Sequence, residues 1–213
     1  MRRKCKYKID ESFFEEVNTP EKAYILGLMY ADGNNYMSNH HSKACLTLKR
    51  SDSYLLDQVN KILGSERPLQ IAQGNSILNI SGKKFSLDLC RLGCVPNKSL
   101  ILTYPTPDQV PNEFTSHFIR GYFDGDGSVV NHSRTTLGVS IAGSHKFLGT
   151  MADILRNSGV SCSVYCRGNI SELRIFRKAS VKTFYGIIYH ESSIMMIRKY
   201  DRFVNHYKKE GLI

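Results

Sequence analysis

Two aspartates, Asp32 and Asp126, occupy equivalent positions in two similar segments of the 213-residue chain. The segment AYILGLMYADGN (23–34) is echoed by HFIRGYFDGDGS (117–128), and the two aspartates lie 126 − 32 = 94 positions apart. Carboxylates that leave room for water and phosphate oxygens suit Mg²⁺, and divalent ions in such sites assist phosphodiester hydrolysis. A single Asp-Gly pair more often forms a simple turn. Because the pair recurs at one offset, the sequence favours a two-carboxylate metal site over two unrelated turns.

Helices are predicted to lead into both aspartates. The residues TPE (19–21) supply an N-cap, a first-turn proline and an early carboxylate, which predicts a helix from about 20 to 31. The residues NE (112–113) open a matching helix that should run to about 125. Glycine inside a helix costs about 1 kcal/mol relative to alanine. Gly27 and Gly121, which keep the same offset (121 − 27 = 94), are therefore predicted to let the two helices approach closely across a pseudo-twofold axis.

This helix pairing would bring Asp32 and Asp126 together at the carboxyl ends of both helices. A carboxylate at that end faces the negative pole of the helix dipole. Two carboxylates about 5 Å apart also repel each other by about 3 kcal/mol at an effective dielectric constant of about 20. A proton or a bound cation must offset this repulsion, which is a second reason to expect a metal site.

The internal similarity extends beyond these two segments. Residues 45–64 parallel residues 138–159, and residues 73–89 parallel residues 167–184. Each half is therefore predicted to form a helix, two strands, a Ser-capped helix, two strands and a further helix, in an α+β fold. The segment TYPTPDQVPN (103–112) contains three of the six prolines of the chain, a composition typical of a linker. The predicted organisation is a first repeat with a basic N-terminal tail over 1–103, a linker over 104–112 and a second repeat over 113–213.

The segments ILGLMYADG (25–33) and IRGYFDGDG (119–127) resemble the paired signatures of the LAGLIDADG homing endonucleases, in their single-chain, two-repeat form. The resemblance covers nearly the whole chain. It implies two αββαββα repeats, related by a pseudo-twofold axis, whose antiparallel sheets form a DNA-binding saddle. The two copies differ at the sixth motif position, which varies in the family: the first copy has Tyr30 where the second has Asp124.

The resemblance also assigns a cofactor and its ligands. In the family, the penultimate acid of each motif binds metal, which nominates Asp32 and Asp126. The backbone carbonyl just before that acid often assists, which nominates Ala31 and Gly125. The implied ion is Mg²⁺, and other divalent ions such as Mn²⁺ are expected to substitute for it.

Two lysines are further candidates, because the family places one lysine beside each scissile phosphate, after the second strand pair and its helix. The segment GCVPNKSL (93–100) nominates Lys98. The segment IMMIRKYDRF (194–203) nominates Lys199, with Arg198 as a rival. These side chains would polarise water or stabilise charge on the phosphate. An ordinary surface lysine is the alternative interpretation for each.

The charge of the chain suits a polyanionic partner. Lys and Arg total 29 against 19 Asp and Glu, so the net charge is +10 and the isoelectric point is about 9.3. The strand-like segments 43–50, 77–83, 137–142 and 162–177 alternate apolar and polar residues, which predicts a core-facing side and an open side that reads DNA. The predicted DNA-binding residues are Lys43, Thr47, Lys49, Arg50, Arg67, Gln70, Asn79, Ser81, Lys83, Arg134, Ser140, Tyr165, Arg167, Arg174 and Arg177. A basic enzyme with solvated sheet faces is the alternative.

Together these features predict a monomeric endonuclease that makes metal-dependent double-strand breaks in a long, weakly palindromic site in double-stranded DNA. Two alternatives remain: a maturase that binds the RNA of a host intron, and a DNA-binding protein that has lost cleavage. Both aspartates being present argues against the second alternative. The sequence contains no HExxH arrangement, which disfavours a zinc hydrolase.

The remaining sequence features concern the cell compartment. Neither a signal-peptide core nor an apolar run of bilayer length occurs, so an intracellular protein that is neither secreted nor membrane-bound is expected. The termini lack the features of an intein, so a free-standing enzyme, encoded within an intron, is the expected origin. The six cysteines are expected to be free thiols, with Cys162 and Cys166 acting as small buried hydrophobic residues.

Overall fold

The order of secondary-structure elements repeats itself along the chain, as a computed structural model shows for residues 7–38, 42–98, 101–133, 136–168 and 170–211. The first half contains α1 (Pro20–Ala31), β1 (Gly33–Met37), β2 (Ser42–Lys49), the 3₁₀ turn η1 (Arg50–Asp52), α2 (Ser53–Ile62), β3 (Gln70–Ala72), β4 (Asn75–Ser81) and α3 (Lys83–Arg91). The second half contains the 3₁₀ turn η3 (Asn112–Phe114), α4 (Thr115–Asp126), β5 (Gly127–Asn131), β6 (Leu137–Gly143), α5 (His145–Asn157), β7 (Ser163–Arg167), β8 (Ile170–Ile175), α6 (Lys178–Tyr189) and α7 (Ile197–Lys209). The predictions for Arg134 and for residues 1–6 of the basic tail lie outside the described residues.

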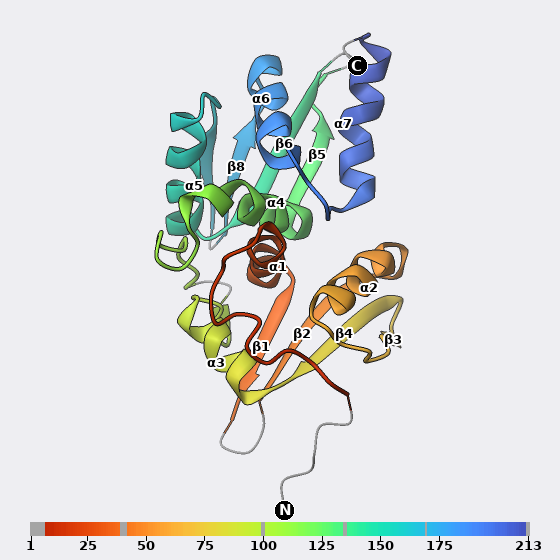
Figure 1. Ribbon diagram of the computed structural model, residues 1–213. Helices are drawn as coiled ribbons and strands as arrows, with labels where there is room; N and C mark the ends of the chain where they lie inside the picture. Colours follow the sequence, from red (N-terminus) through yellow and green to blue (C-terminus); the bar gives the residue numbers. More distant parts are fainter. Residues whose placement is uncertain (1–6, 39–41, 99–100, 134–135, 169, 212–213) are drawn as a thin grey trace, which may run out of the picture.

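Each half folds its four strands into one antiparallel sheet, and the strand order is the same in both. The orders are β1-β2-β4-β3 and β5-β6-β8-β7. Helices α2 and α3 cover one face of the first sheet, α5 and α6 cover one face of the second, and α1 and α4 lie side by side between the halves (Figure 1). The predicted α+β fold of two αββαββα repeats is confirmed.

Both motifs enter their sheets in the same register. Gly33, the first residue of β1, pairs with the buried Leu46 of β2. Gly127, the first residue of β5, pairs with the buried Ile141 of β6. Because side chains alternate between the faces of a strand, these pairings place one row of each strand in the core and leave the other row on the open face.

The two motif helices approach each other closely at their glycines. A Cβ atom on Gly27 would lie 2.1 Å from the backbone oxygen of Phe118, and one on Gly121 would lie 2.0 Å from the backbone oxygen of Tyr24. Phe118 and Tyr24 are themselves 118 − 24 = 94 positions apart, so the contact is the same when viewed from either helix. The packing therefore follows a pseudo-twofold axis between α1 and α4, and no side chain larger than hydrogen fits at either glycine.

Side-chain caps begin two of the predicted helices. The Thr19 hydroxyl accepts a hydrogen bond from the backbone N–H of Lys22 at the start of α1 (3.2 Å), and Ser144 caps α5 by accepting from Phe147 N (3.3 Å). The prediction of a serine cap on the first-repeat counterpart of α5 is wrong. Helix α2 follows the turn η1, and its N-cap residue is Asp52, whose side chain makes no capping bond.

Helix α7 is additional to the predicted repeat, which ends with α6. The buried residues of α7 are Lys199, Phe203 and Tyr207, which are four positions apart and form one helical stripe. This stripe was a usable signal in the sequence. In the structure α7 packs beside the β5 edge of the second sheet (Figure 1).

The segment between the two halves packs against the second repeat. The ring of Tyr104 lies 5.4 Å from the rings of both Phe118 and Phe147, measured between centroids. Leu102 and Val110 are buried on either side of it. The connection is thus anchored by apolar contacts at three points, although its described residues form no helix or strand.

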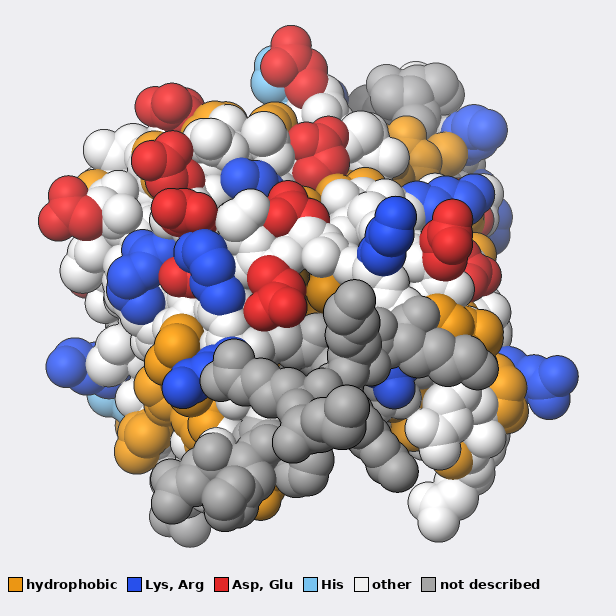
Figure 2. Space-filling view, turned by 60° about the horizontal axis from the view of Figure 1, so that its bottom comes forward, with side chains coloured by type: hydrophobic (Ala, Val, Ile, Leu, Met, Phe, Trp, Pro, Cys, Tyr) orange, Lys and Arg blue, Asp and Glu red, His pale blue; other side chains and the backbone are white. Residues whose placement is uncertain are grey.

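Charge of both signs is present on the surface. Figure 2 shows acidic side chains gathered in the upper part of the face that forms the bottom of Figure 1, with Lys and Arg side chains among them and toward both flanks. Surface ion pairs such as Lys84–Asp88 and Arg156–Asp153, both 2.9 Å, neutralise part of this charge. Within the described residues, no helix has the length and apolar character needed to cross a bilayer.

Candidate active site

The two motif aspartates lie at the points where α1 and α4 end and strands begin. Asp32 is the C-cap of α1, and Asp126 is the last residue of α4. The next residues, Gly33 and Gly127, start β1 and β5. A Cβ atom on either glycine would lie 2.5 Å from the carbonyl oxygen four residues earlier in its helix. Only glycine therefore allows the chain to turn sharply into the strand directly after each carboxylate.

The two carboxyl-terminal helix ends are in contact. A Cβ atom on Gly125 would lie 2.2 Å from the Cβ of Ala31 and 3.1 Å from Oδ2 of Asp32. The interface thus has room for one methyl group, and Ala31 supplies it. A hollow of about 240 Å³ is lined by Asp126, Ala31 and Lys98, and a second hollow of about 370 Å³ is lined by Asp32 together with the same Ala31 and Lys98. Each carboxylate therefore borders a space large enough for a phosphate group and water.

Desolvation and mutual repulsion raise the pKa of both carboxyl groups. The pKa of Asp32 is raised to about 6, first by burial and then by the negative charge of Asp126, while Lys199 and Lys98 act in the opposite direction. Asp126 is exposed at the surface, but desolvation by the protein around its carboxyl still raises its pKa against the lowering effects of Tyr122 and the two lysines. A bound divalent cation would remove this cost of ionisation. The donor set, two carboxylates with backbone oxygens nearby, therefore fits a hard ion such as Mg²⁺.

Each candidate lysine lies near the carboxyl end of one motif helix, but the two bind different backbone atoms. Lys98 Nζ donates to the backbone oxygen of Gly33 (2.5 Å). Lys199 Nζ donates to the backbone oxygens of Phe123 (2.7 Å), Asp124 (2.6 Å) and, at longer range, Gly125 (3.4 Å). Both side chains are buried.

The lysines are thus placed where a positive charge opposes the negative end of a helix dipole. Burial lowers the pKa of Lys199 to about 8, although the nearby aspartates act to raise it. The rival to Lys199, Arg198, has a different partner. Its Nε donates to both carboxylate oxygens of Asp52, at 3.0 and 3.2 Å. Lys199 therefore lies at the end of α4, whereas Arg198 turns toward the first repeat.

The difference between the motifs at their sixth position has a structural explanation. The hydroxyl of Tyr30 donates to the backbone oxygen of Leu92, near the start of the segment that carries Lys98. Asp124 Oδ2 instead accepts a bond of 2.7 Å from the backbone N–H of Met196, at the start of α7. Each residue type matches its partner, because a hydroxyl can donate to a carbonyl and a carboxyl oxygen can accept from a backbone N–H.

The predicted DNA-binding residues are distributed unevenly over the sheet faces. Exposed members are Lys43, Lys49, Arg50, Gln70, Lys83, Tyr165, Arg167 and Arg177, and partly buried members are Thr47, Arg67, Ser81, Ser140 and Arg174. Several contact one another. Arg67 donates to Ser81 at 2.9 Å, and the guanidinium of Arg174 lies 5.0 Å from the ring centroid of Tyr165.

Three of these predictions need correction. Asn79 was expected to be exposed, but it is buried, and its amide donates to Gln70 Oε1 at 3.2 Å across the β3–β4 pair. Lys83 was placed at the end of a strand, but the strand ends at Ser81 and Lys83 is the first residue of α3. Arg177 was placed on the open side of a strand, but it is the N-cap residue of α6. Cross-strand pairing and the early end of both strands account for these errors.

Glu172 on β8 was missed, although it lies on the polar row of that strand two residues before Arg174. Its carboxylate accepts from Arg174 (2.6 Å) and from the hydroxyl of Ser140, and it forms an ion pair with Arg167 (3.2 Å). These contacts lower the pKa of Glu172 and raise that of Arg174. An ionised acid therefore organises two arginines and a serine on the open face of the second sheet.

The cysteines also depart in part from expectation. The described cysteines are free, but Cys166 is exposed on β7 rather than buried, and its Sγ lies 3.4 Å from Nδ1 of His145. Cys162 is partly buried. Among the described residues, no group of three or more His, Cys, Asp or Glu side chains is arranged to hold a metal ion. Any ion at the motif aspartates therefore needs backbone oxygens, water or substrate to complete its ligands.

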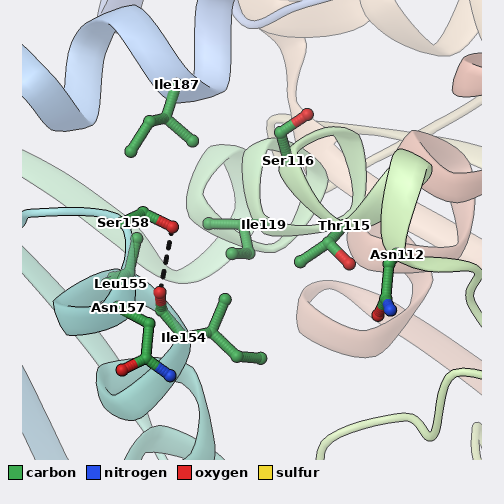
Figure 3. A pocket seen from close by; sticks show the side chains of 9 residues that line it. All are labelled: Asn112, Thr115, Ser116, Ile119, Ile154, Leu155, Asn157, Ser158 and Ile187. Atoms are coloured by element: carbon green, nitrogen blue, oxygen red, sulfur yellow. Dashed lines mark hydrogen bonds between the residues drawn. The ribbon is translucent and has the colours of Figure 1, made fainter.

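A separate cavity of about 360 Å³ lies between α4, α5 and α6. Figure 3 shows Ile119, Ile154 and Ile187 around it, with Thr115 and Ser158 among the polar side chains at its margin. None of the described residues that line it is charged. Without a charged group among these residues, the cavity offers no carboxylate to hold a metal ion and no cation to neutralise a phosphate, so the motif aspartates remain the candidate site.

Comparison with known proteins relates part of the sequence to a family. Residues 113–189 match the family described as LAGLIDADG-like domain. No curated protein matches the chain. This match lies within the second repeat, which is therefore similar in sequence to a LAGLIDADG-like domain.

Solved structures extend the likeness to the whole chain. The LAGLIDADG homing endonuclease I-LtrWI bound to target DNA is 10% identical, with a TM-score of 0.62 over 95% of this chain and 91% of that one. A mesophilic variant of the homing endonuclease I-DmoI is 17% identical, with a TM-score of 0.60 over 88% and 98%. I-SmaMI bound to uncleaved DNA in the presence of calcium ions is 11% identical, with a TM-score of 0.58 over 92% and 94%. The chain as a whole therefore has the fold of the LAGLIDADG homing endonucleases, and the predicted resemblance is confirmed.

Proposed function

We propose that this chain is a site-specific endonuclease that cleaves both strands of duplex DNA with the help of Mg²⁺. The observation that carries the proposal is the pairing of Asp32 and Asp126 at the ends of two helices that contact each other at Gly27 and Gly121. The net charge of +10 and the two uncovered sheet faces support duplex DNA as the substrate. Because one chain holds both carboxylates, we propose that the monomer is the active unit, with repeats over 1–103 and 113–213 joined by residues 104–112.

The residues that would hold the ion are Asp32 and Asp126, together with the backbone oxygens of Ala31 and Gly125. A divalent ion at such a site supplies activation of water and stabilisation of the leaving oxygen. The protein contributes two desolvated carboxylates that repel each other, which favours binding of a cation over two ionised groups left alone. The Gly125 oxygen keeps most of its accepting capacity, because its bond from Lys199 is long at 3.4 Å.

Lys98 and Lys199 would each serve one strand of the DNA. Lys98 binds the Gly33 oxygen just after α1, and Lys199 binds carbonyls in the last turn of α4, so one ammonium group lies near the end of each motif helix. Positive charge held in a fixed position stabilises negative charge that develops on a phosphate in the transition state. The open faces of the two sheets carry different side chains, so the preferred target is expected to be only weakly palindromic.

Cleavage selection from a randomised duplex library in Mg²⁺ tests this function. The wild type is compared with the double variant Asp32→Asn/Asp126→Asn and with Asp57→Asn, which removes one exposed carboxylate on α2, far along the chain from both motifs. We expect the wild type and Asp57→Asn to cut one long site. We expect the double variant to bind the same site without cutting it, because asparagine has nearly the same size as aspartate but lacks its negative charge.

Other outcomes contradict the proposal in distinct ways. Enrichment of one duplex by binding, with no cutting by the wild type, would show a DNA-binding protein without cleavage. No enrichment would argue against duplex DNA and lead to structured RNA as the next candidate. Binding of the selected duplex should also weaken with salt, with a log–log slope of about −0.9 per neutralised phosphate.

A further inference from the structure

The first turn of α7 is held by residues outside that helix. The first backbone N–H groups of a helix have no partner within the helix, and they are commonly bound by the side chain of the N-cap residue. The N-cap of α7 is Met196, whose thioether is a poor acceptor and makes no capping bond. Two other side chains take its place: Asp124 Oδ2 accepts from Met196 N (2.7 Å), and the hydroxyl of Tyr54 accepts from Ile197 N (2.6 Å).

The next residue of α7 is fastened as well. Arg198 Nε donates to both oxygens of Asp52, whose side chain is only 3% exposed. Asp52, the last residue of η1, and Tyr54, in the first turn of α2, belong to the first repeat, whereas Asp124 belongs to α4 of the second repeat. The N-cap Met196 and the first two residues of α7 therefore each have a partner outside the helix, and two of these partners come from the opposite repeat.

We propose that Asp52, Tyr54 and Asp124 form a clamp, here called the α7 clamp, that positions Lys199 at the active site. Lys199 directly follows the three clamped residues, and its ammonium group reaches the backbone oxygens of Phe123 and Asp124. The inference rests on the proposed function, since it assigns these residues a role in DNA cleavage. The first repeat thereby sets the place of the lysine in the second.

The lysine of the first repeat has no such cross-repeat anchor among its described contacts. The segment leading to Lys98 is held from within its own repeat, by Tyr30 at the Leu92 carbonyl and by Asn35, whose amide donates to the Cys94 carbonyl at 3.0 Å. Loosening the α7 clamp should therefore disturb Lys199 and leave Lys98 in place. Because each lysine would serve one strand, the effect on cleavage should be confined to one strand.

The conservative variant Tyr54→Phe tests the clamp, with Tyr207→Phe as its matched control. Tyr54→Phe removes the acceptor of Ile197 N and keeps the ring. Tyr207 lies on α7 itself, and its hydroxyl has no hydrogen-bond partner, so its loss should not disturb the first turn. Asp52→Asn serves as a second variant, because it weakens the contact with Arg198 at nearly constant volume.

Two readouts are used, and the first needs no DNA. Acylation of lysines by a small activated ester, followed by mass spectrometry, reports the accessibility of Lys199 against the exposed Lys208 and Lys209 of the same helix. We expect Lys199 to be modified about fivefold faster in Tyr54→Phe and Asp52→Asn, the change expected for the loss of one hydrogen bond, and to be unchanged in Tyr207→Phe. The second readout is the cleavage rate of each end-labelled strand at saturating enzyme. We expect one strand to be cut about fivefold more slowly and the other at the wild-type rate.

Unchanged acylation of Lys199 in both clamp variants would overturn the proposal. Equal slowing of both strands would also overturn it, because a general loss of structure would have that effect. If the wild type cuts no DNA, the proposed function fails by itself, and the acylation experiment still decides whether the clamp holds Lys199.

Discussion

Replacing Gly27 with alanine should force α1 and α4 apart. The added Cβ would lie 2.1 Å from the backbone oxygen of Phe118, and a contact of this kind needs more than 3.0 Å. The nearest atom belongs to the backbone of α4, so no side-chain rotation can relieve the overlap. The two helices must instead separate by about 1 Å along the interface between the repeats, which loosens contacts on both sides of the glycine.

The size of the effect follows from two opposing contributions. Overpacking of a close interface costs about 1–3 kcal/mol, and a backbone clash places Gly27→Ala at the upper end of that range. Alanine is a better helix former than glycine by about 1 kcal/mol, which offsets part of this cost. The expected net loss is about 2 kcal/mol in the free energy of unfolding, or about 4–8 °C in Tm for a protein of this size.

Urea denaturation followed by circular dichroism measures this loss, and Gly149→Ala supplies the control. Gly149 also lies inside a helix, α5, but a Cβ there would meet no atom within 4 Å. That variant should be as stable as the wild type or up to about 1 kcal/mol more stable. The double variant Gly27→Ala/Gly121→Ala should lose less than the sum of its single variants, because one separation of the helices accommodates both methyl groups. Equal stability of Gly27→Ala and Gly149→Ala would refute the close-packing argument.

Three further predictions follow from the site. In the absence of divalent ions, the pKa of Asp32 is raised to about 6 from an ordinary value of 3.8. Between these two pH values the folded protein keeps a proton that the unfolded chain has lost. The wild type should therefore lose stability as the pH rises from about 4 to 6. The variant Asp32→Asn should not show this loss of stability with pH, and it should be more stable than the wild type above pH 6. Parallel curves of Tm against pH for the two proteins, from pH 4 to 7, would contradict this prediction. In Gly125→Ala the new methyl group would lie 2.2 Å from that of Ala31 and would displace the neighbouring Asp32 carboxylate. The cleavage rate should fall by about 10²-fold while the affinity for DNA stays unchanged. A parallel loss of affinity would count against this reasoning. Glu172→Gln should release Arg174 toward phosphate, raising affinity for unrelated duplexes and steepening the salt slope by about 0.9, and an unchanged slope in a binding titration would count against that role.

Much of the architecture was predictable because it depends on local, periodic information. Period-2 alternation in residues 43–49 identified the strand and its buried side, and the cap and proline at 19–20 identified the start of α1. The constant offset of 94 between Gly27 and Gly121 indicated a duplicated helix pair, since one close contact serves both copies. Alternation was a weaker guide to boundaries, so the positions of Lys83 and Arg177 relative to their strands were wrong. Helix α7 was missed although its buried stripe was visible in the sequence.

The amino-acid sequence by itself determined which acids could form the site, because Asp32 and Asp126 stand at the same place in a repeated motif. Only the tertiary structure decided which of Arg198 and Lys199 lies at the end of α4, and why one motif has a tyrosine where the other has Asp124. It also decided that Glu172 organises the open face of the second sheet. The physical reason is the same in each case. Periodicity specifies which face of an element a residue occupies, whereas a hydrogen bond between distant residues depends on how packed elements bring a donor and an acceptor within about 3 Å.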